Sequence, residues 1–128
     1  MLVKDVMNIN PNLLYEEDTI LNASKFMKEE RVRNLPVVDK NNTLIGLITL
    51  REIIETVFHN PSKILVRDAM IKQVTCVQPE TPLKDAIETM LVNKFGCLPV
   101  VDEETKLIGF VSEADLLKTL HGLTKIKK

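Results

Sequence analysis

The sequence predicts an α/β fold of the mixed α+β kind, made of two β-α-β-β-α repeats packed face to face with pseudo-two-fold symmetry. An internal repeat is the first observation behind this prediction. Shifting the chain by 63 residues places LPVVD at 35–39 on LPVVD at 98–102, and LIG at 44–46 on LIG at 107–109. No gap is needed anywhere in the comparison. An ungapped match of this length indicates a duplicated supersecondary unit.

The first half of each repeat predicts a strand followed by a helix. Short apolar runs at residues 13–15 and 74–77 are the expected strands. Asp18 is the predicted N-cap of the first helix, and Thr81 is the predicted N-cap of its counterpart, with Pro82 at the first helical position. Apolar residues at helical spacing then follow in both copies: Ile20, Ala23 and Met27, and Leu83, Ala86, Ile87, Met90 and Leu91.

The second half of each repeat predicts a β-hairpin and a closing helix. LPVV is followed by a polar turn and then by LIGLIT or LIGFVS, and the closing helices are expected at residues 51–58 and 114–120. The strands are continuous apolar runs, which is typical of sheets covered on both faces. One repeat of about 60 residues cannot cover both faces of its own sheet, so the two copies are expected to pack together.

Three segments follow from this plan. Repeat 1 is predicted to span residues 1–60 and repeat 2 residues 61–122, with the boundary in a polar stretch that contains Pro61. Residues 123–128 are predicted to be a flexible basic tail. The two repeats together are expected to form one module.

Composition argues against several classes of protein. Of 128 residues, 45% are apolar and 27% are charged, and the net charge is −1, so a broad basic face for nucleic acid is not expected. No apolar run has the roughly 18 residues of a membrane span, and the N-terminus lacks a signal-peptide core. We therefore expect a cytoplasmic protein, in which Cys76 and Cys97 are reduced, buried hydrophobic residues.

The sequence shows no catalytic or metal-binding signature. His59 and His121 occupy corresponding ends of the repeats and belong to no ligand spacing. The local sequence suggests no Ser-His-acid or Cys-His pair, and four glycines are too few for a phosphate loop of the Gly-rich type. The prediction is a non-catalytic protein without a bound metal.

Two strand-to-helix corners carry a hydroxyl and an acid at the same spacing. Thr49 precedes Glu52 by three residues, and Ser112 precedes Asp115 by three. This is the pattern of a capping box, which stability alone explains. The alternative is a ligand site, because a helix N-terminus attracts phosphate and a nearby carboxylate can accept from ribose hydroxyls. Both interpretations stay open at this point.

The whole repeat resembles a pair of cystathionine-β-synthase (CBS) domains, also called a Bateman module. The resemblance spans residues 2–121 and rests on the ordered duplication of KDVM and RDAM, DTI and TPL, LPVVD, and GLITLRE and GFVSEAD. It implies a disc-like homodimer of modules and clefts that bind adenosine-containing ligands, such as AMP, ADP, ATP or S-adenosylmethionine. No cofactor is required.

The resemblance also implies two unequal clefts. Cleft B, the favoured one, joins Ser112, which would contact phosphate or ribose, and Asp115, which would accept from ribose, to Asn10, Pro11, Asn12, Val32 and Arg33. Cleft A joins Thr49 and Glu52 to Gln73, Val74, Thr75, Phe95 and Gly96.

Departures from the family pattern weaken cleft A more than cleft B. Glu52 replaces the usual Asp, and Phe95 is expected to fill cleft A. Cys97 and Asn34 stand where some nucleotide-binding relatives have Arg, which favours a nucleoside or a mono- or diphosphate over a triphosphate. Arg33 is a candidate phosphate partner, and the alternative is a solvated charge.

The expected function is that of a ligand sensor. An adenosine-containing ligand would bind between the repeats and change the arrangement that a separate partner protein contacts. The alternative is a dimerisation or docking module that binds no ligand. The composition disfavours a membrane or nucleic-acid partner.

Overall fold

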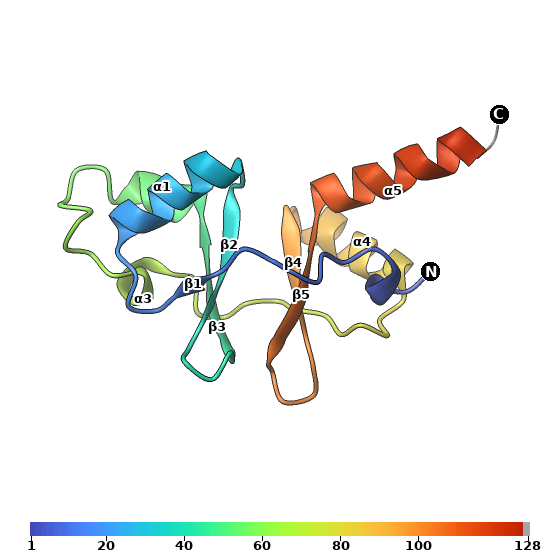
Figure 1. Cartoon of the computed structure of the whole chain (residues 1–128), viewed down its shortest axis with the longest axis horizontal. Helices are drawn as coiled ribbons and strands as arrows, with labels where there is room; N and C mark the ends of the chain where they lie inside the picture. The colour runs from blue at the N-terminus through green and yellow to red at the C-terminus, as the bar shows by residue number, and fades with distance from the viewer. Residues whose placement is uncertain (127–128) are drawn as a thin grey trace. The chain divides into compact units, whose positions relative to one another are not determined.

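In a computed structural model that describes residues 1–126, the chain forms two compact units (Figure 1). Unit 1 combines Met1–Pro11 with the chain from Thr75 onward, and unit 2 is the continuous segment Asn12–Val74. In Figure 1 the dark-blue start of the chain accordingly lies among the yellow and red elements of unit 1. Each unit therefore takes a short segment from the sequence that precedes the other repeat.

Unit 2 contains one three-stranded sheet with the order β1-β2-β3. The first pair of strands is parallel and the second pair is an antiparallel hairpin, in the register Leu35 with Ile48. The elements follow the predicted order: β1 (Leu14–Tyr15), α1 (Ile20–Glu30), β2 (Asn34–Val38), β3 (Leu44–Thr49), α2 (Leu50–Glu55) and, after the repeat, α3 (Val66–Ala69).

Unit 1 repeats the arrangement with one weaker strand. The run at residues 74–77 forms only a single parallel bridge, between Val77 and Val100, and leaves a two-stranded sheet. Its elements are η1 (Val3–Asp5, a 3-10 helix), α4 (Leu83–Asn93), β4 (Cys97–Val101), β5 (Leu107–Ser112) and α5 (Glu113–Ile126). The α/β class is confirmed in both units, and the strand-helix-strand-strand-helix order is confirmed in unit 2; in unit 1 the predicted first strand is only the Val77 bridge.

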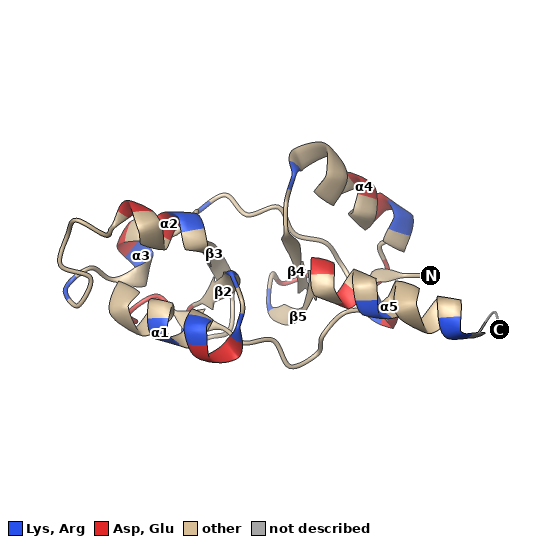
Figure 2. Cartoon of the chain, turned by 90° about the horizontal axis from the view of Figure 1, so that it is seen from above, with Lys and Arg blue, Asp and Glu red and all other residues tan. Residues whose placement is uncertain are grey.

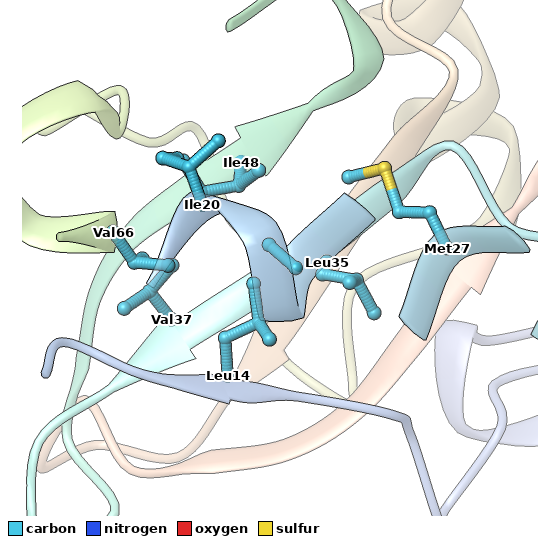
Figure 3. Close-up of a cluster of buried hydrophobic side chains, with 8 residues drawn as sticks. Leu14, Ile20, Met27, Leu35, Val37, Ile48 and Val66 are labelled. Atoms are coloured by element: carbon cyan, nitrogen blue, oxygen red, sulfur yellow. The ribbon is translucent and has the colours of Figure 1, made fainter. Parts of the chain in front are cut away.

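Each unit has its own apolar core. The short segment that the unit takes from the sequence before the other repeat, here called the borrowed segment, completes that core. In unit 2 the side chain of Val66 from α3 is fully buried beside Ile20, Val37 and Ile48 (Figure 3). In unit 1 the corresponding residue, Val3, is fully buried among the side chains of α4, β4 and β5. β2 and β4 are buried almost throughout, as predicted, whereas β3 and β5 alternate between buried and half-buried residues.

The predicted N-caps Asp18 and Thr81 are wrong. Their side-chain oxygens accept hydrogen bonds from the backbone N–H groups of Tyr15 (2.8 Å) and Gln78 (3.1 Å), and so close the turn before each helix. Each helix begins one residue later than those caps require. Thr19 caps α1 instead, and α4 has no side-chain cap.

The closing helices differ in length from the prediction and from each other. α2 ends at Glu55, where Thr56 Oγ1 donates to the carbonyl of Ile53 at 2.7 Å and the chain turns. α5 continues to Ile126 and includes residues 123–126 of the predicted tail, while residues 127–128 lie outside the described part. None of the helices in residues 1–126 has the length and apolar character needed to cross a membrane.

Glycine allows the borrowed segments to lie directly against the hairpins. A Cβ atom added at Gly46 would lie 3.0 Å from the carbonyl oxygen of Ile71 and in collision with the Met70 side chain. At Gly109 it would lie 2.7 Å from the Sδ of Met7. The backbone also pairs beside Gly46, since the N–H of Leu47 donates to the carbonyl of Ile71 at 3.0 Å and the N–H of Ile71 donates to the carbonyl of Leu47 at 2.8 Å.

Gly46→Ala is therefore expected to destabilise the chain by about 1–3 kcal/mol, because the added methyl group displaces residues 70–71 from the hairpin. Gly122→Ala is the matched control, because nothing lies within 4 Å of its added Cβ, and it should stabilise α5 by about 0.5–1 kcal/mol. Urea unfolding of the three proteins measures both effects. Equal stability of Gly46→Ala and the wild type would contradict the close approach.

Candidate functional site

The two strand-to-helix corners form capping boxes. The N–H of Ser112 donates to Asp115 Oδ2 at 2.8 Å, its Oγ donates to the same oxygen at 2.9 Å, and the N–H of Asp115 donates back to Ser112 Oγ at 3.3 Å. At the other corner, the N–H and Oγ1 of Thr49 donate to Glu52 Oε1 at 2.7 and 2.5 Å. The capping interpretation is confirmed at both corners. The longer acid accepts from the N–H and the hydroxyl of its capping residue, as the shorter one does.

Each cap uses one of the two oxygens of its carboxylate. Within residues 1–126 the hydrogen bonds of Asp115 end on Oδ2 and those of Glu52 on Oε1. Both side chains are half-buried. The corners thus serve stability and retain acceptor capacity, and the two interpretations of the motif are compatible.

The predicted residues of each cleft come from both compact units. For cleft B, unit 1 supplies Asn10, Pro11, Ser112 and Asp115, and unit 2 supplies Asn12, Val32 and Arg33. For cleft A, unit 2 supplies Thr49, Glu52, Gln73 and Val74, and unit 1 supplies Thr75, Phe95 and Gly96. The geometry below is that of each unit by itself.

In unit 1 the predicted cleft-B residues lie on or beside β5. The N–H of Asn8 donates to the carbonyl of Phe110 at 2.9 Å, and the reciprocal bond is 3.0 Å. Two residues further on, the N–H of Asn10 donates to Asn8 Oδ1 at 3.0 Å, which starts the turn toward Pro11. β5 therefore carries the Asn10 segment on one edge and ends in the Ser112 corner.

The structure also joins residues that the sequence assigns to different clefts. The N–H of Glu113 donates to the carbonyl of Gly96 at 3.2 Å, so the predicted cleft-A residues Phe95 and Gly96 lie beside the Ser112 corner. In unit 2, the N–H of Leu50 donates to the carbonyl of Arg33 at 2.9 Å, beside the Thr49 corner. The Arg33 side chain itself is exposed.

Two hollows were not predicted from the sequence. One, of about 460 Å³, lies between α4 and α5 in unit 1, and Phe95 and Gly96 line it. The other, also about 460 Å³, lies in unit 2 and is polar, with Glu52, Glu55 and Asp68 in its walls. In the sequence, the first hollow was indicated by Leu91, an additional apolar residue among those at helical spacing in α4. Residues 1–126 contain no group of three or more acid, His or Cys side chains that could hold a metal ion.

The predicted burial of the cysteines is confirmed for Cys97, and Cys76 is half-buried. Burial raises the pKa of the Cys76 thiol. Burial, together with the nearby negative charge of Glu113, raises the pKa of the Cys97 thiol to about 12. A thiol held this far from ionisation is a poor nucleophile at neutral pH, so Cys97 acts as a packing residue.

Cys97 should make the protein less stable in alkali. The thiol of the unfolded chain ionises near 9.0, whereas the folded thiol stays protonated up to about 12. Its stabilising contribution is full below pH 9 and decreases as the pH rises toward 12, with a slope of at most about 1.4 kcal/mol per pH unit. Denaturant unfolding between about pH 8 and 10.5 should show this slope in the wild type, and Cys97→Ala should lack it. Parallel curves for the two proteins would contradict the raised pKa.

Comparison with known proteins shows what the duplicated unit is. The CBS domain family model matches residues 3–59 and again residues 66–122. Inosine-5'-monophosphate dehydrogenase of Methanocaldococcus jannaschii is 34% identical over 92% of this chain, and the chain spans 22% of that enzyme's length.

Two solved structures share the fold over nearly their whole length. AcuB from Vibrio cholerae has a TM-score of 0.91 and 27% identity, over 99% of this chain and 95% of that one. CBSX2, solved in complex with AMP, has a TM-score of 0.86 and 29% identity, over 99% and 98%. The tandem match and the shared fold lead to one conclusion: the chain belongs to the CBS domain family, as a pair of CBS domains.

Proposed function

We propose that this CBS pair is a regulatory module that binds an adenosine-containing ligand at the Ser112–Asp115 corner and transmits binding to a separate partner protein. The observation that carries the proposal is the corner itself: a capped helix start with a hydroxyl and a carboxylate that has an open oxygen. The AMP complex of the similar CBSX2 supports the ligand class. A nucleoside or a mono- or diphosphate fits better than a triphosphate.

The lengths of the two helices favour cleft B over cleft A. α5 has 14 residues and α2 has 6. The partial positive charge at a helix start depends on the aligned peptide dipoles behind it, so the Ser112 corner attracts an anionic group more strongly. Asn10, Pro11, Asn12, Val32 and Arg33 would complete this site around the adenosine.

Signalling would not require catalysis by this chain. Its cysteine thiols are held protonated, and its histidines are exposed at positions outside the proposed cleft. The proposed setting is the cytoplasm, where adenine nucleotides are available, and the proposed assembly is a homodimer. A ligand that binds one arrangement of the module better than another shifts the population that the partner contacts.

A thermal-shift series tests the ligand class. AMP, ADP, ATP, S-adenosylmethionine and cyclic di-AMP are added to the full chain, each up to millimolar concentration. A ligand that binds only the folded state stabilises it by about 2.7 kcal/mol at one hundred times its Kd, so AMP or ADP should raise the Tm by several degrees. The sensor function in its adenosine form is wrong if none of the five changes the Tm.

The second candidate function is a docking module without a ligand. The observation that favours it is the number of exposed apolar side chains on the helices, including Ile54, Leu91 and Leu117. Such groups mark protein–protein contacts in many proteins. The thermal-shift series separates the two candidates, because only the sensor responds to small molecules.

A further inference from the structure

The two capping boxes have the same geometry and different charges. Residues 112–115 are SEAD, and residues 49–52 are TLRE. Glu113 therefore adds a second carboxylate next to Asp115 in the first turn of α5, whereas Arg51 adds a guanidinium group in the first turn of α2. In Figure 2 the start of α5 is red, and a blue segment lies at the start of α2.

The chain that runs beside each corner increases this difference. In unit 1 the N–H of Glu113 donates to the carbonyl of Gly96 at 3.2 Å, and in unit 2 the N–H of Leu50 donates to the carbonyl of Arg33 at 2.9 Å. The two contacts are equivalent in the repeat, because each pair of residues is related by the 63-residue shift. The same backbone position thus has no side chain at the Ser112 corner and an arginine at the Thr49 corner.

The charge of Glu113 also acts on the interior of the Ser112 corner. Cys97 lies opposite Ser112 in the ladder of β4 and β5, and it is buried. Burial, and after it the negative charge of Glu113, raises the pKa of the Cys97 thiol to about 12. A carboxylate that opposes a negative charge on Cys97 also opposes one on a ligand beside Ser112.

The charges at the Ser112 corner can be compared in size. The aligned dipoles of α5 amount to about half a positive charge at the helix start. Glu113 and Asp115 bring two full negative charges to the same turn. Lys94, at the end of α4, brings one positive charge on an exposed side chain. Glu113 therefore offsets the attraction that the long helix exerts on an anion.

We propose that Glu113 makes the Ser112 corner select adenosyl compounds that carry no phosphate on the 5′ carbon of the ribose. This inference rests on the proposed function, in which Asp115 accepts from the ribose hydroxyls. The 5′ carbon belongs to the same sugar, so its substituent lies close to the corner. A phosphate brings about 1.5 to 2 negative charges there, a hydroxyl brings none, and a sulfonium group brings a positive charge. The preferred ligand is a nucleoside or a 5′-sulfonium nucleoside such as S-adenosylmethionine.

Titration calorimetry with three ligands tests this selection on the full chain. Glu113→Gln keeps the size of the side chain and removes its charge. The affinity for AMP should rise by about fivefold at low salt, and the affinity for S-adenosylmethionine should fall by about twofold. Adenosine, which is uncharged, should change least. A purely structural role of Glu113 would move all three affinities in the same direction, so opposite changes identify an effect of charge.

The other corner supplies a stronger exchange and its control. Glu113→Leu combined with Ala114→Arg gives the Ser112 corner the residues found at 50–51, and AMP should then bind more tightly than adenosine. Leu50→Glu combined with Arg51→Ala makes the reverse exchange at the Thr49 corner. This control should change the ratio of the two affinities by less than about twofold, because the charges at the Ser112 corner stay as they are.

Salt provides a measurement on the wild type alone. In 1 M KCl the screening length falls to about 3 Å, so the repulsion from Glu113 is largely removed. The affinity for AMP relative to adenosine should therefore rise with salt in the wild type and change less in Glu113→Gln. Attraction of the phosphate by the corner would give a fall instead, and that result would overturn the proposal.

The outcomes separate this inference from the proposed function. If adenosine and AMP both bind and Glu113→Gln leaves the AMP affinity unchanged or lower, the role of Glu113 is wrong and the sensor function stands. A wild type that binds AMP more tightly than adenosine would also overturn the selection. If none of the three ligands binds, the proposed function fails and this inference fails with it. Circular dichroism of each variant confirms that the measured protein is folded.

Discussion

Deletion of residues 1–11 is expected to unfold unit 1 and to leave unit 2 folded. Val3 is fully buried in the core of unit 1, and its N–H donates to the carbonyl of Thr81 at 2.9 Å. Asn8 exchanges two hydrogen bonds with Phe110 on β5. Burial of one valine alone contributes about 1.5–3 kcal/mol, and the deletion also exposes the edge of a two-stranded sheet. The total is comparable to the stability of a small unit.

Hydrogen exchange followed by proteolysis would show which of the two units unfolds in the deletion variant. Amides from Thr75 onward should lose protection in the deletion variant, while those of 12–74 should keep it. Val3→Asp in the intact chain should give the same pattern, because burial of an unpaired carboxylate costs several kcal/mol. Lys4→Asp changes the exposed neighbour and is the matched control. Uniform loss of protection across both units would show that the two units do not fold independently.

Replacement of Asp115 by alanine is expected to reduce the affinity for AMP at least tenfold, whereas Glu52→Ala should change it by less than threefold. Both variants lose a capping acid of the same geometry, so both should lose a similar stability of about 0.5–2 kcal/mol. Because both variants lose a similar stability, Glu52→Ala is the control for loss of the cap without loss of the ligand contact. The difference in affinity then measures what Asp115 contributes to the ligand.

Titration calorimetry with AMP gives the two affinities, and thermal unfolding without ligand gives the two cap energies. Ser112→Ala should weaken binding in the same direction as Asp115→Ala, because its hydroxyl lies at the same corner. Equal losses of affinity at Asp115 and Glu52 would show that both corners bind, and the preference for cleft B would then be wrong.

The sequence was sufficient for the parts of the fold that local pattern determines. The repeat gave both hairpins, since LPVVD and LIG recur in register, and the three-residue spacing gave both capping boxes. The N-caps were harder to predict, because Asp18 and Thr81 can close a preceding turn as readily as they can cap a helix.

Long-range partners could not be predicted in the same way. Val3 and Val66 each lie in a short segment with no periodicity of its own. Nothing nearby in the sequence indicates that each valine enters the core that the other repeat forms. The length of α5 was also missed, because its last turn contains Lys125, and a lysine is typical of a tail and equally favourable at a helix C-terminus.

The borrowed segment of unit 1 also has a consequence for the order of folding during synthesis. Unit 2 is complete in the chain once Val74 has been made, whereas residues 1–11 must wait for β4 and β5. Closure of a flexible loop as long as 12–74 would cost about 4 kcal/mol in chain entropy. A folded unit 2 fixes the two ends of that loop beforehand. Residues 1–11 are therefore expected to fold after unit 2, although they precede it in the chain.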